Sequence, residues 1–159
     1  MIETRALDEG DWKIWRELRL AALTEAPQAF CARLADWQGD GDREERWRSR
    51  LAVPGSYNVV ATLDGQPVGM ASGMPTDQDG VVELISMYVA PAGRGRGVGD
   101  HILDAVERWA RQTGAETVRL AVKAGNEHAW ALYRRNGFHD TGDFLHGENL
   151  LAKRLDRAD

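Results

Sequence analysis

The chain has 159 residues, enough to bury a sizeable core, and we interpret residues 1–159 as a single domain. Its formal net charge of −5 argues against bulk binding of nucleic acid or anionic lipid, because both depend on an excess of Lys and Arg. A lone cysteine, Cys31, excludes an intramolecular disulfide and is interpreted as a buried structural thiol. The N-terminal stretch lacks an apolar signal core, and no run approaches the roughly 18 apolar residues of a membrane span. We therefore expect a cytoplasmic protein that does not enter a membrane.

The first third of the chain predicts one strand and two helices. Residues 2–7 alternate weakly and indicate a short strand. Asp8 and Asp11 suit a helix start, because carboxylates accept hydrogen bonds from the free N–H groups there. Apolar residues then keep helical spacing until Pro27 ends the pattern, and a second, more polar helix is expected at 42–51.

The middle of the chain predicts a hairpin followed by a long buried strand. Strands at 57–63 and 67–73 flank Asp64-Gly65, a dipeptide typical of hairpin turns because Gly tolerates positive φ. The run VVELISMYVA at 81–90 is typical of a largely buried strand, and Pro91 ends it.

The last third alternates helices and strands. Its predicted segments are, in order, a glycine-rich loop at 93–99, a helix closed by Thr113-Gly114, a strand at 116–123, a helix from Asn126 to a C′ cap at Gly137, and strands at 138–142 and 148–155. The whole order is β-α-α-β-β-β-α-β-α-β-β, which predicts a mixed α/β domain with a central sheet.

The glycine-rich loop indicates an anion site. A buried strand leads into it and a helix starts from it, so unpartnered N–H groups and the helix dipole favour phosphate. Arg94 and Arg96 add positive charge there. A P-loop is excluded because Gly99 is followed by Asp100 rather than Lys. A dinucleotide fingerprint that starts at Gly95 fails too, since its last glycine would fall on Asp100.

Two motifs carry a resemblance to the GNAT acetyltransferase superfamily. The loop Arg94-Gly95-Arg96-Gly97-Val98-Gly99 resembles the family's R/Q-x-x-G-x-G/A signature and follows a strand of the form S-M-Y-V-A-P. The run from Asn126 to Phe138 is similar to the family's N-x-x-A-x-x-x-Y-x-x-x-G-F segment. The sequence P-Q-A-F at 27–30 also resembles a pattern of some bacterial members.

The resemblance implies an acyl-CoA N-acyltransferase fold of the α/β (α+β) type, with acetyl-CoA as co-substrate. Its central sheet is mixed, mostly antiparallel, flanked by helices, and splayed open between the strands at 81–90 and 116–123. Pantetheine would pair with the backbone of the first strand, pyrophosphate would rest on the loop, and a tyrosine would lie near the sulfur. The cofactor-binding residues implied are Met87, Tyr88, Val89, Arg94, Gly95, Arg96, Gly97, Val98, Gly99, Asn126, Ala129 and Tyr133. Asp100 departs from the family's usual basic or hydroxyl residue, and we expect it to face solvent.

The implied reaction is direct transfer of the acetyl group to a primary amine within a ternary complex. The amine must lose a proton and the departing thiolate must gain one. Tyr133 is the candidate acid, with a purely structural aromatic as the alternative. Glu83, the only carboxyl group in 81–90, is the candidate base that deprotonates the amine. The alternative is that Glu83 is an exposed carboxylate without a catalytic role and that a chain of waters removes the proton. His101 and His128 match no motif position and are expected at the surface.

The acceptor is not readable from the sequence and is a small-molecule amine, an antibiotic, or a peptide or protein amine. Acidic loops favour a cationic acceptor only weakly; they contain Asp36, Asp40, Asp42, Asp77, Asp79, Asp140 and Asp143. No metal-ligand spacing is present, so we predict no metal. The alternative function is a non-catalytic CoA-binding sensor or regulatory module, and a nucleotide- or RNA-binding loop is more remote. Homodimers are common in the family, but nothing in the sequence fixes an oligomeric state.

Overall fold

The computed structural model describes residues 1–26 and 33–155, and it contains the predicted elements in the predicted order. Short 3₁₀ turns accompany them near residues 9, 34, 39 and 91. Pro27, the P-Q-A-F sequence and Cys31 lie outside the described residues. The helices and strands are β1 (Ile2–Ala6), α1 (Trp12–Glu25), α2 (Glu44–Leu51), β2 (Tyr57–Leu63), β3 (Gln66–Pro75), β4 (Val81–Val89), α3 (Val98–Gln112), β5 (Thr117–Lys123), α4 (Glu127–Arg135), β6 (His139–Leu145) and β7 (Glu148–Arg154).

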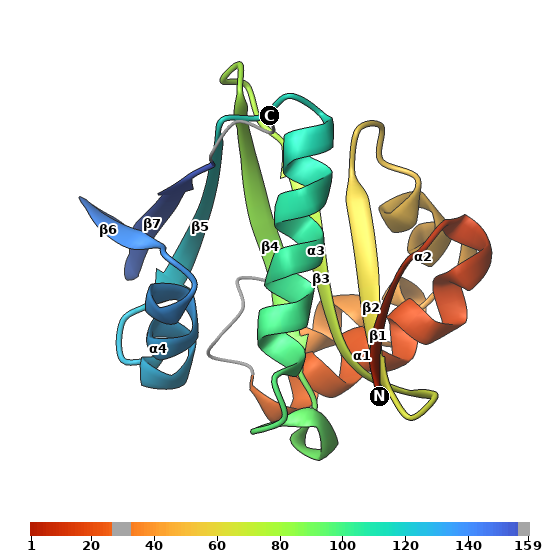
Figure 1. Cartoon of the computed structure of the whole chain (residues 1–159). Coiled ribbons are helices and arrows are strands. Elements are labelled where there is room, and N and C mark those ends of the chain that lie inside the picture. Colours follow the sequence, from red (N-terminus) through yellow and green to blue (C-terminus); the bar gives the residue numbers. More distant parts are fainter. Residues whose placement is uncertain (27–32, 156–159) are drawn as a thin grey trace.

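One seven-stranded sheet organises the molecule, with the strand order β1-β2-β3-β4-β5-β7-β6 (Figure 1). Every neighbouring pair is antiparallel except β4 and β5, which run parallel because α3 connects them. The expected mixed, mostly antiparallel sheet flanked by helices is confirmed. Among the described residues, no helix is both long and apolar enough to cross a membrane.

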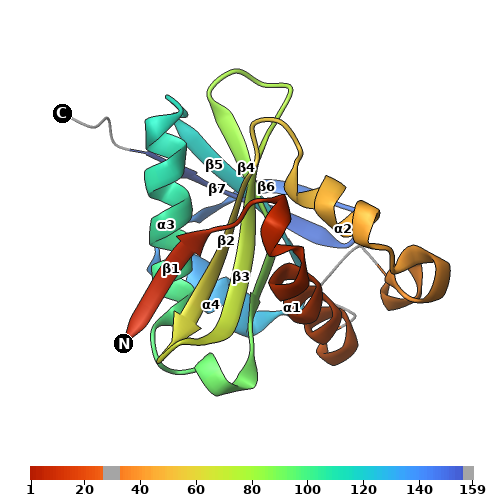
Figure 2. The ribbon, with the colours of Figure 1, turned by 90° about the vertical axis from the view of Figure 1, so that its right-hand side faces the viewer.

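Helices cover the two faces of the sheet and bury a core on each (Figure 2). The α3 face is filled by residues such as Ile102 and Val106, with side chains of α4 packed against the same cluster. The opposite face is covered by α1 and α2 and centres on Trp15 and Trp47, both fully buried. Strand alternation supplies both cores: in β2, for example, Val59 lies in the first and Val60 in the second.

A β-bulge in β4 interrupts this alternation. Met70 pairs with Tyr88 and Ser72 pairs with Ile85, so β4 has one more residue than β3 between these pairs. Ser86 lies within the bulge and has a φ of 56°, uncommon for a residue other than glycine. The extra residue turns Tyr88 onto the α1 and α2 face, although Leu84, an even number of residues away, faces α3.

Candidate functional site

A cleft opens where β4 and β5 separate. Their pairing involves Val81–Glu83 of β4 and Thr117–Arg119 of β5, and the strands diverge beyond it (Figure 1). The cleft has a volume of about 940 Å³. It is lined by the later residues of both strands, by the glycine-rich loop and by one side of α4. The structure thus confirms the splayed sheet that the resemblance implies.

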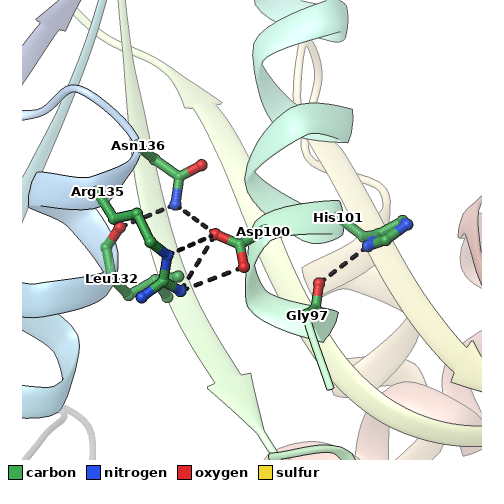
Figure 3. Close-up of polar contacts among 6 residues, drawn as sticks. All are labelled: Gly97, Asp100, His101, Leu132, Arg135 and Asn136. Atoms are coloured by element: carbon green, nitrogen blue, oxygen red, sulfur yellow. Dashed lines mark hydrogen bonds and ion pairs between the residues drawn. The ribbon is translucent and has the colours of Figure 1, made fainter. Parts of the chain in front are cut away.

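The glycine-rich loop gives α3 an uncapped N-terminus at the cleft. Gly95 and Gly97 have φ values of 73° and 85°, which explains why glycine stands at these turns. Gly97 is the N-cap residue of α3, and no side chain accepts a hydrogen bond from the first turn. The N–H groups that begin this helix therefore remain available for an anion. In the first turn of α3, Nδ1 of His101 lies 2.9 Å from the Gly97 carbonyl oxygen (Figure 3). Because a carbonyl oxygen can only accept a hydrogen bond, Nδ1 is the donor.

Arg94 is anchored to the end of α1. Its Nε donates to the carbonyl oxygen of Val89 at 3.0 Å, and its guanidinium forms an ion pair with Glu25. The Tyr88 hydroxyl donates to the same carboxylate at 2.7 Å. These bonds, first from Tyr88 and then from Arg94, hold the pKa of Glu25 below its usual value. Burial, followed by the bond to Glu25, raises the pKa of Tyr88 to about 12.

Asp100 lines the cleft and is bound to α4, so our expectation that it would face solvent was wrong, although its side chain is still 39% exposed. Its carboxylate accepts from Nδ2 of Asn136 at 2.8 Å and from the guanidinium of Arg135 at 3.2 Å, both at the end of α4 (Figure 3). Partial burial alone would raise the pKa of Asp100, but these hydrogen bonds outweigh it and lower the pKa overall. Arg135 of the neighbouring helix thus neutralises the Asp100 carboxylate. The sequence around Asp100 could not indicate this pairing.

One side of α4 presents the predicted residues to the cleft. Asn126 is the N-cap residue, and its Oδ1 accepts from the N–H of Ala129 at 3.3 Å. At the other end, Gly137 has a φ of 91°, and the N–H of Phe138 donates to the carbonyl of Tyr133 at 3.0 Å, which closes a Schellman motif. Asn126, Ala129 and Tyr133 all line the cleft.

Tyr133 is almost fully buried, 7% exposed, and packs edge-on against Phe138 with ring centroids 5.8 Å apart. Burial raises the pKa of its hydroxyl, which therefore keeps its proton at neutral pH. Among the described residues, no group hydrogen-bonds this hydroxyl. A buried, protonated phenol beside the cleft suits a proton donor.

Glu83 lies apart from the other candidates. It is half-buried at the last β4–β5 pair, and its Oε1 is 3.5 Å from Nε of Arg119 on the neighbouring strand. It does not contribute to the cleft lining, in which Leu84 is the first residue of β4. Its role as a base stays a prediction.

The cleft gathers most of the predicted cofactor residues and adds some that the motifs missed. Predicted residues in its lining are Met87, Tyr88, Val89, Arg94, Gly95, Gly97, Val98, Gly99, Asn126, Ala129 and Tyr133. Arg96 is exposed and outside that lining. Additional lining residues include Ser86, Lys123, His128, Leu132 and Arg135. His101 and His128 are exposed, as expected. Leu132 is three residues after Ala129, and this helical spacing could have indicated that it lies on the same side of the helix. Nothing in the local sequence indicated that Arg135, rather than Arg134, would line the cleft.

Comparisons with known proteins point to one family. A family model described as the acetyltransferase (GNAT) family matches residues 12–138. The chain is 33% identical over 130 residues to the N-alpha-acetyltransferase RimI of Mycobacterium tuberculosis, across 77% of this chain and 79% of that protein. It is 27% identical over 144 residues to the aminoglycoside N(6')-acetyltransferase type 1 of Stenotrophomonas maltophilia, across 86% of each. The PaiA N-acetyltransferase of Thermoplasma acidophilum, solved in complex with coenzyme A, has a TM-score of 0.79 over 98% of this chain and 99% of that one, with 19% identity. At that identity the likeness concerns the fold.

Proposed function

Because the chain belongs to the acetyltransferase (GNAT) family, we propose that it transfers the acetyl group of acetyl-CoA directly to a primary amine within a ternary complex. The observation that carries this proposal is the cleft between β4 and β5, which ends at the uncapped N-terminus of α3. An extended chain fits between separated strands, and its phosphates suit free N–H groups at a helix start. The PaiA structure, which has the same fold, contains coenzyme A.

The proposed cofactor contacts follow from this arrangement. The backbone of Met87, Tyr88 and Val89 would pair with pantetheine, because β5 no longer pairs with this part of β4. The N–H groups of residues 94–99 would hold the pyrophosphate, and Asn126 and Ala129 would flank the cofactor from α4. When bound, acetyl-CoA supplies an activated acetyl thioester.

We propose that Tyr133 donates the proton that the departing sulfur requires. Its raised pKa keeps the hydroxyl protonated, and its place in the cleft wall supports contact with the sulfur. Glu83 stays our candidate for deprotonating the amine, with a chain of waters as the other route. Its absence from the cleft lining and its pairing with Arg119 favour transfer through at least one water.

The proposal is tested by titrating acetyl-CoA calorimetrically and then screening amines, antibiotics and peptide N-termini for release of free thiol. We expect binding at micromolar concentrations and turnover with at least one amine class. Tyr133→Phe should lower kcat by about 10²- to 10⁴-fold and leave the affinity for acetyl-CoA nearly unchanged, because only the proton is lost. Absence of acetyl-CoA binding would end the assignment.

A CoA-binding sensor of the same fold remains the alternative function. It shares the cleft but requires no proton donor, so it predicts tight cofactor binding, no turnover with any amine, and no effect of Tyr133→Phe. The acceptor class is not transferred from relatives, because RimI and the aminoglycoside enzyme are named for different acceptors. We further propose that residues 1–159 form one domain, since the two cores share a single sheet.

A further inference from the structure

A polar cluster lies beneath β4, on the face that α1 and α2 cover. Arg50 of α2 donates from Nη1 to Oδ1 of Asn58 at 3.1 Å and from Nη2 to Oγ of Ser72 at 2.9 Å. The Ser72 hydroxyl in turn donates to Asn58 at 2.7 Å. Asn58 and Ser72 are 3% and 0% exposed, so this cluster is enclosed on the strand side.

No carboxylate among the described residues pairs with the Arg50 guanidinium of this cluster. Arg50 forms no ion pair with any residue in the described parts of the chain, and its hydrogen-bond partners are neutral. Burial lowers the pKa of Arg50, and burial, followed by repulsion from Arg50, lowers the pKa of Arg19 to about 10. The Arg50 guanidinium is thus held in a partly desolvated place, which is unfavourable unless an anion joins it.

One contact of Arg50 connects this charge to the cleft. Its Nη2 lies 3.5 Å from Oγ of Ser86, and Ser86 lines the cleft. Ser86 is also the bulge residue with positive φ, a strained conformation that is most often retained where a site requires it. It directly precedes Met87, which the proposed function assigns to pantetheine. The Arg50 guanidinium lies outside the cleft lining, but the Ser86 hydroxyl that it contacts belongs to that lining.

We propose that the acceptor amine carries a carboxylate close to its nitrogen, and that Arg50 and Ser86 bind this carboxylate. The proposal rests on the acetyltransferase function and names its substrate class, an amino acid or a compound with the same pair of groups. A guanidinium has five N–H donors, and the three contacts described leave donors for a carboxylate. None of the seven acidic loop residues that would favour a cationic acceptor lines the cleft.

The test compares acceptors that differ only in the carboxylate. L-phenylalanine with phenethylamine, L-leucine with isoamylamine, and L-tryptophan with tryptamine form matched pairs. For the wild-type protein we expect KM to be at least about tenfold lower for the carboxylated member of a pair, the effect of one charge-assisted hydrogen bond. Arg50→Met should raise that KM to the value for the decarboxylated member, with the KM for acetyl-CoA unchanged.

The matched control is Arg48→Met, on the same helix, where the guanidinium pairs with Glu44 at 3.0 Å and donates to the Glu9 carbonyl oxygen rather than to Ser86. It should leave the KM ratio as in wild type. Arg50→Lys keeps the charge and should retain part of the preference. If Arg50→Met does not fold in a thermal melt, Ser86→Gly, which removes the hydroxyl and relieves the positive φ, should reduce the preference instead.

A calorimetric titration of N-acetyl-L-phenylalanine into the CoA complex provides a readout without turnover. Binding that Arg50→Met weakens by about tenfold supports the proposal, and no binding to the wild-type complex overturns it. Equal KM values within the pairs, or a preference that Arg50→Met does not change, also overturn it while the acetyltransferase function stands. Failure to bind acetyl-CoA at all would instead refute the proposed function itself.

Discussion

The glycine-rich loop is held at each end by one charged residue bound to a different helix. Arg94 pairs with Glu25 at the end of α1, and Asp100 pairs with Arg135 at the end of α4. These contacts change the charge that a phosphate would meet. The Arg94 charge is partly neutralised, while Arg135 brings a cation to the cleft that the loop's own sequence does not contain.

We therefore expect Arg135→Ala to weaken coenzyme A binding by about tenfold, the usual effect of losing a charge-assisted contact. The variant would leave the Asp100 carboxylate uncompensated near the phosphate site. The double variant with Asp100→Asn should recover most of the lost affinity. Calorimetric Kd values of coenzyme A for the single and double variants test this prediction.

Arg134→Ala is the matched control, because Arg134 is exposed and lies over the ring of Trp130. It should leave the Kd within a factor of about two. An equal loss of affinity in both single variants would indicate a general charge effect rather than the Asp100–Arg135 pair.

The contacts around this loop mark the limit of prediction from sequence at the residue scale. Motif spacing alone predicts that Asn126, Ala129 and Tyr133 lie at the cleft. It cannot pair Asp100 with Arg135 or Arg94 with Glu25, because periodicity describes only neighbours along one element. These partners are brought together by the packing of separate helices.

At the scale of elements, α1 and α2 are joined by Asp42, just before α2. Its carboxylate accepts from Nε of Arg16 at 2.8 Å and from Nε1 of Trp47 at 2.8 Å. The hydrogen bonds from Arg16 and then Trp47 lower the pKa of Asp42 to about 2. Asp42 belongs to the acidic loops that could rim an acceptor pocket, but these contacts indicate a structural role.

Asp42→Asn should lower the free energy of unfolding by about 1 kcal/mol at pH 7, a modest value because the ion pair is about a third exposed. The folded-state pKa lies below the unfolded value of about 3.9, so the stabilisation is complete above pH 4. It is lost as the pH falls from about 4 to about 2. Urea denaturation of both proteins across that range should show the curves converging.

Asp40→Asn, two positions away at an exposed site, provides the control and should change stability by less than about 0.5 kcal/mol at any pH. A difference between wild type and Asp42→Asn that persists unchanged at pH 2 would contradict the assigned ion pair.

Element boundaries were largely predictable because turn residues mark them. Asp64-Gly65 and Gly137 stand where the hairpin turn and the helix end occur. The bulge at Ser86 was not predictable, since VVELISMYVA reads as one continuous apolar strand whose two faces cannot be told apart. The direction of Tyr88, and with it the bond to Glu25, depends on that one extra residue.

At the scale of the whole molecule, the two halves of the sheet meet through a short parallel pair and α3. A ligand that fills the cleft and binds only the folded state should raise stability by mass action. At a concentration 100 times its Kd, coenzyme A should add about 2.7 kcal/mol, or about 5–10 °C in Tm. Differential scanning fluorimetry with ATP at the same concentration as the control checks this. An equal shift with ATP would favour a general nucleotide site.

The separation of β4 from β5 has a further consequence for how the backbone exchanges its hydrogens with water. At Val82 and Glu83, β4 is an interior strand, whereas from Leu84 onward one side of it is an edge. Its amides on that side have no strand partner and should exchange with deuterium much faster than those at its start. Bound pantetheine would complete the edge and slow them. The first residues of β4 would thus always have a strand partner on both sides. The later residues would gain a partner on the cleft side only when the cofactor is bound.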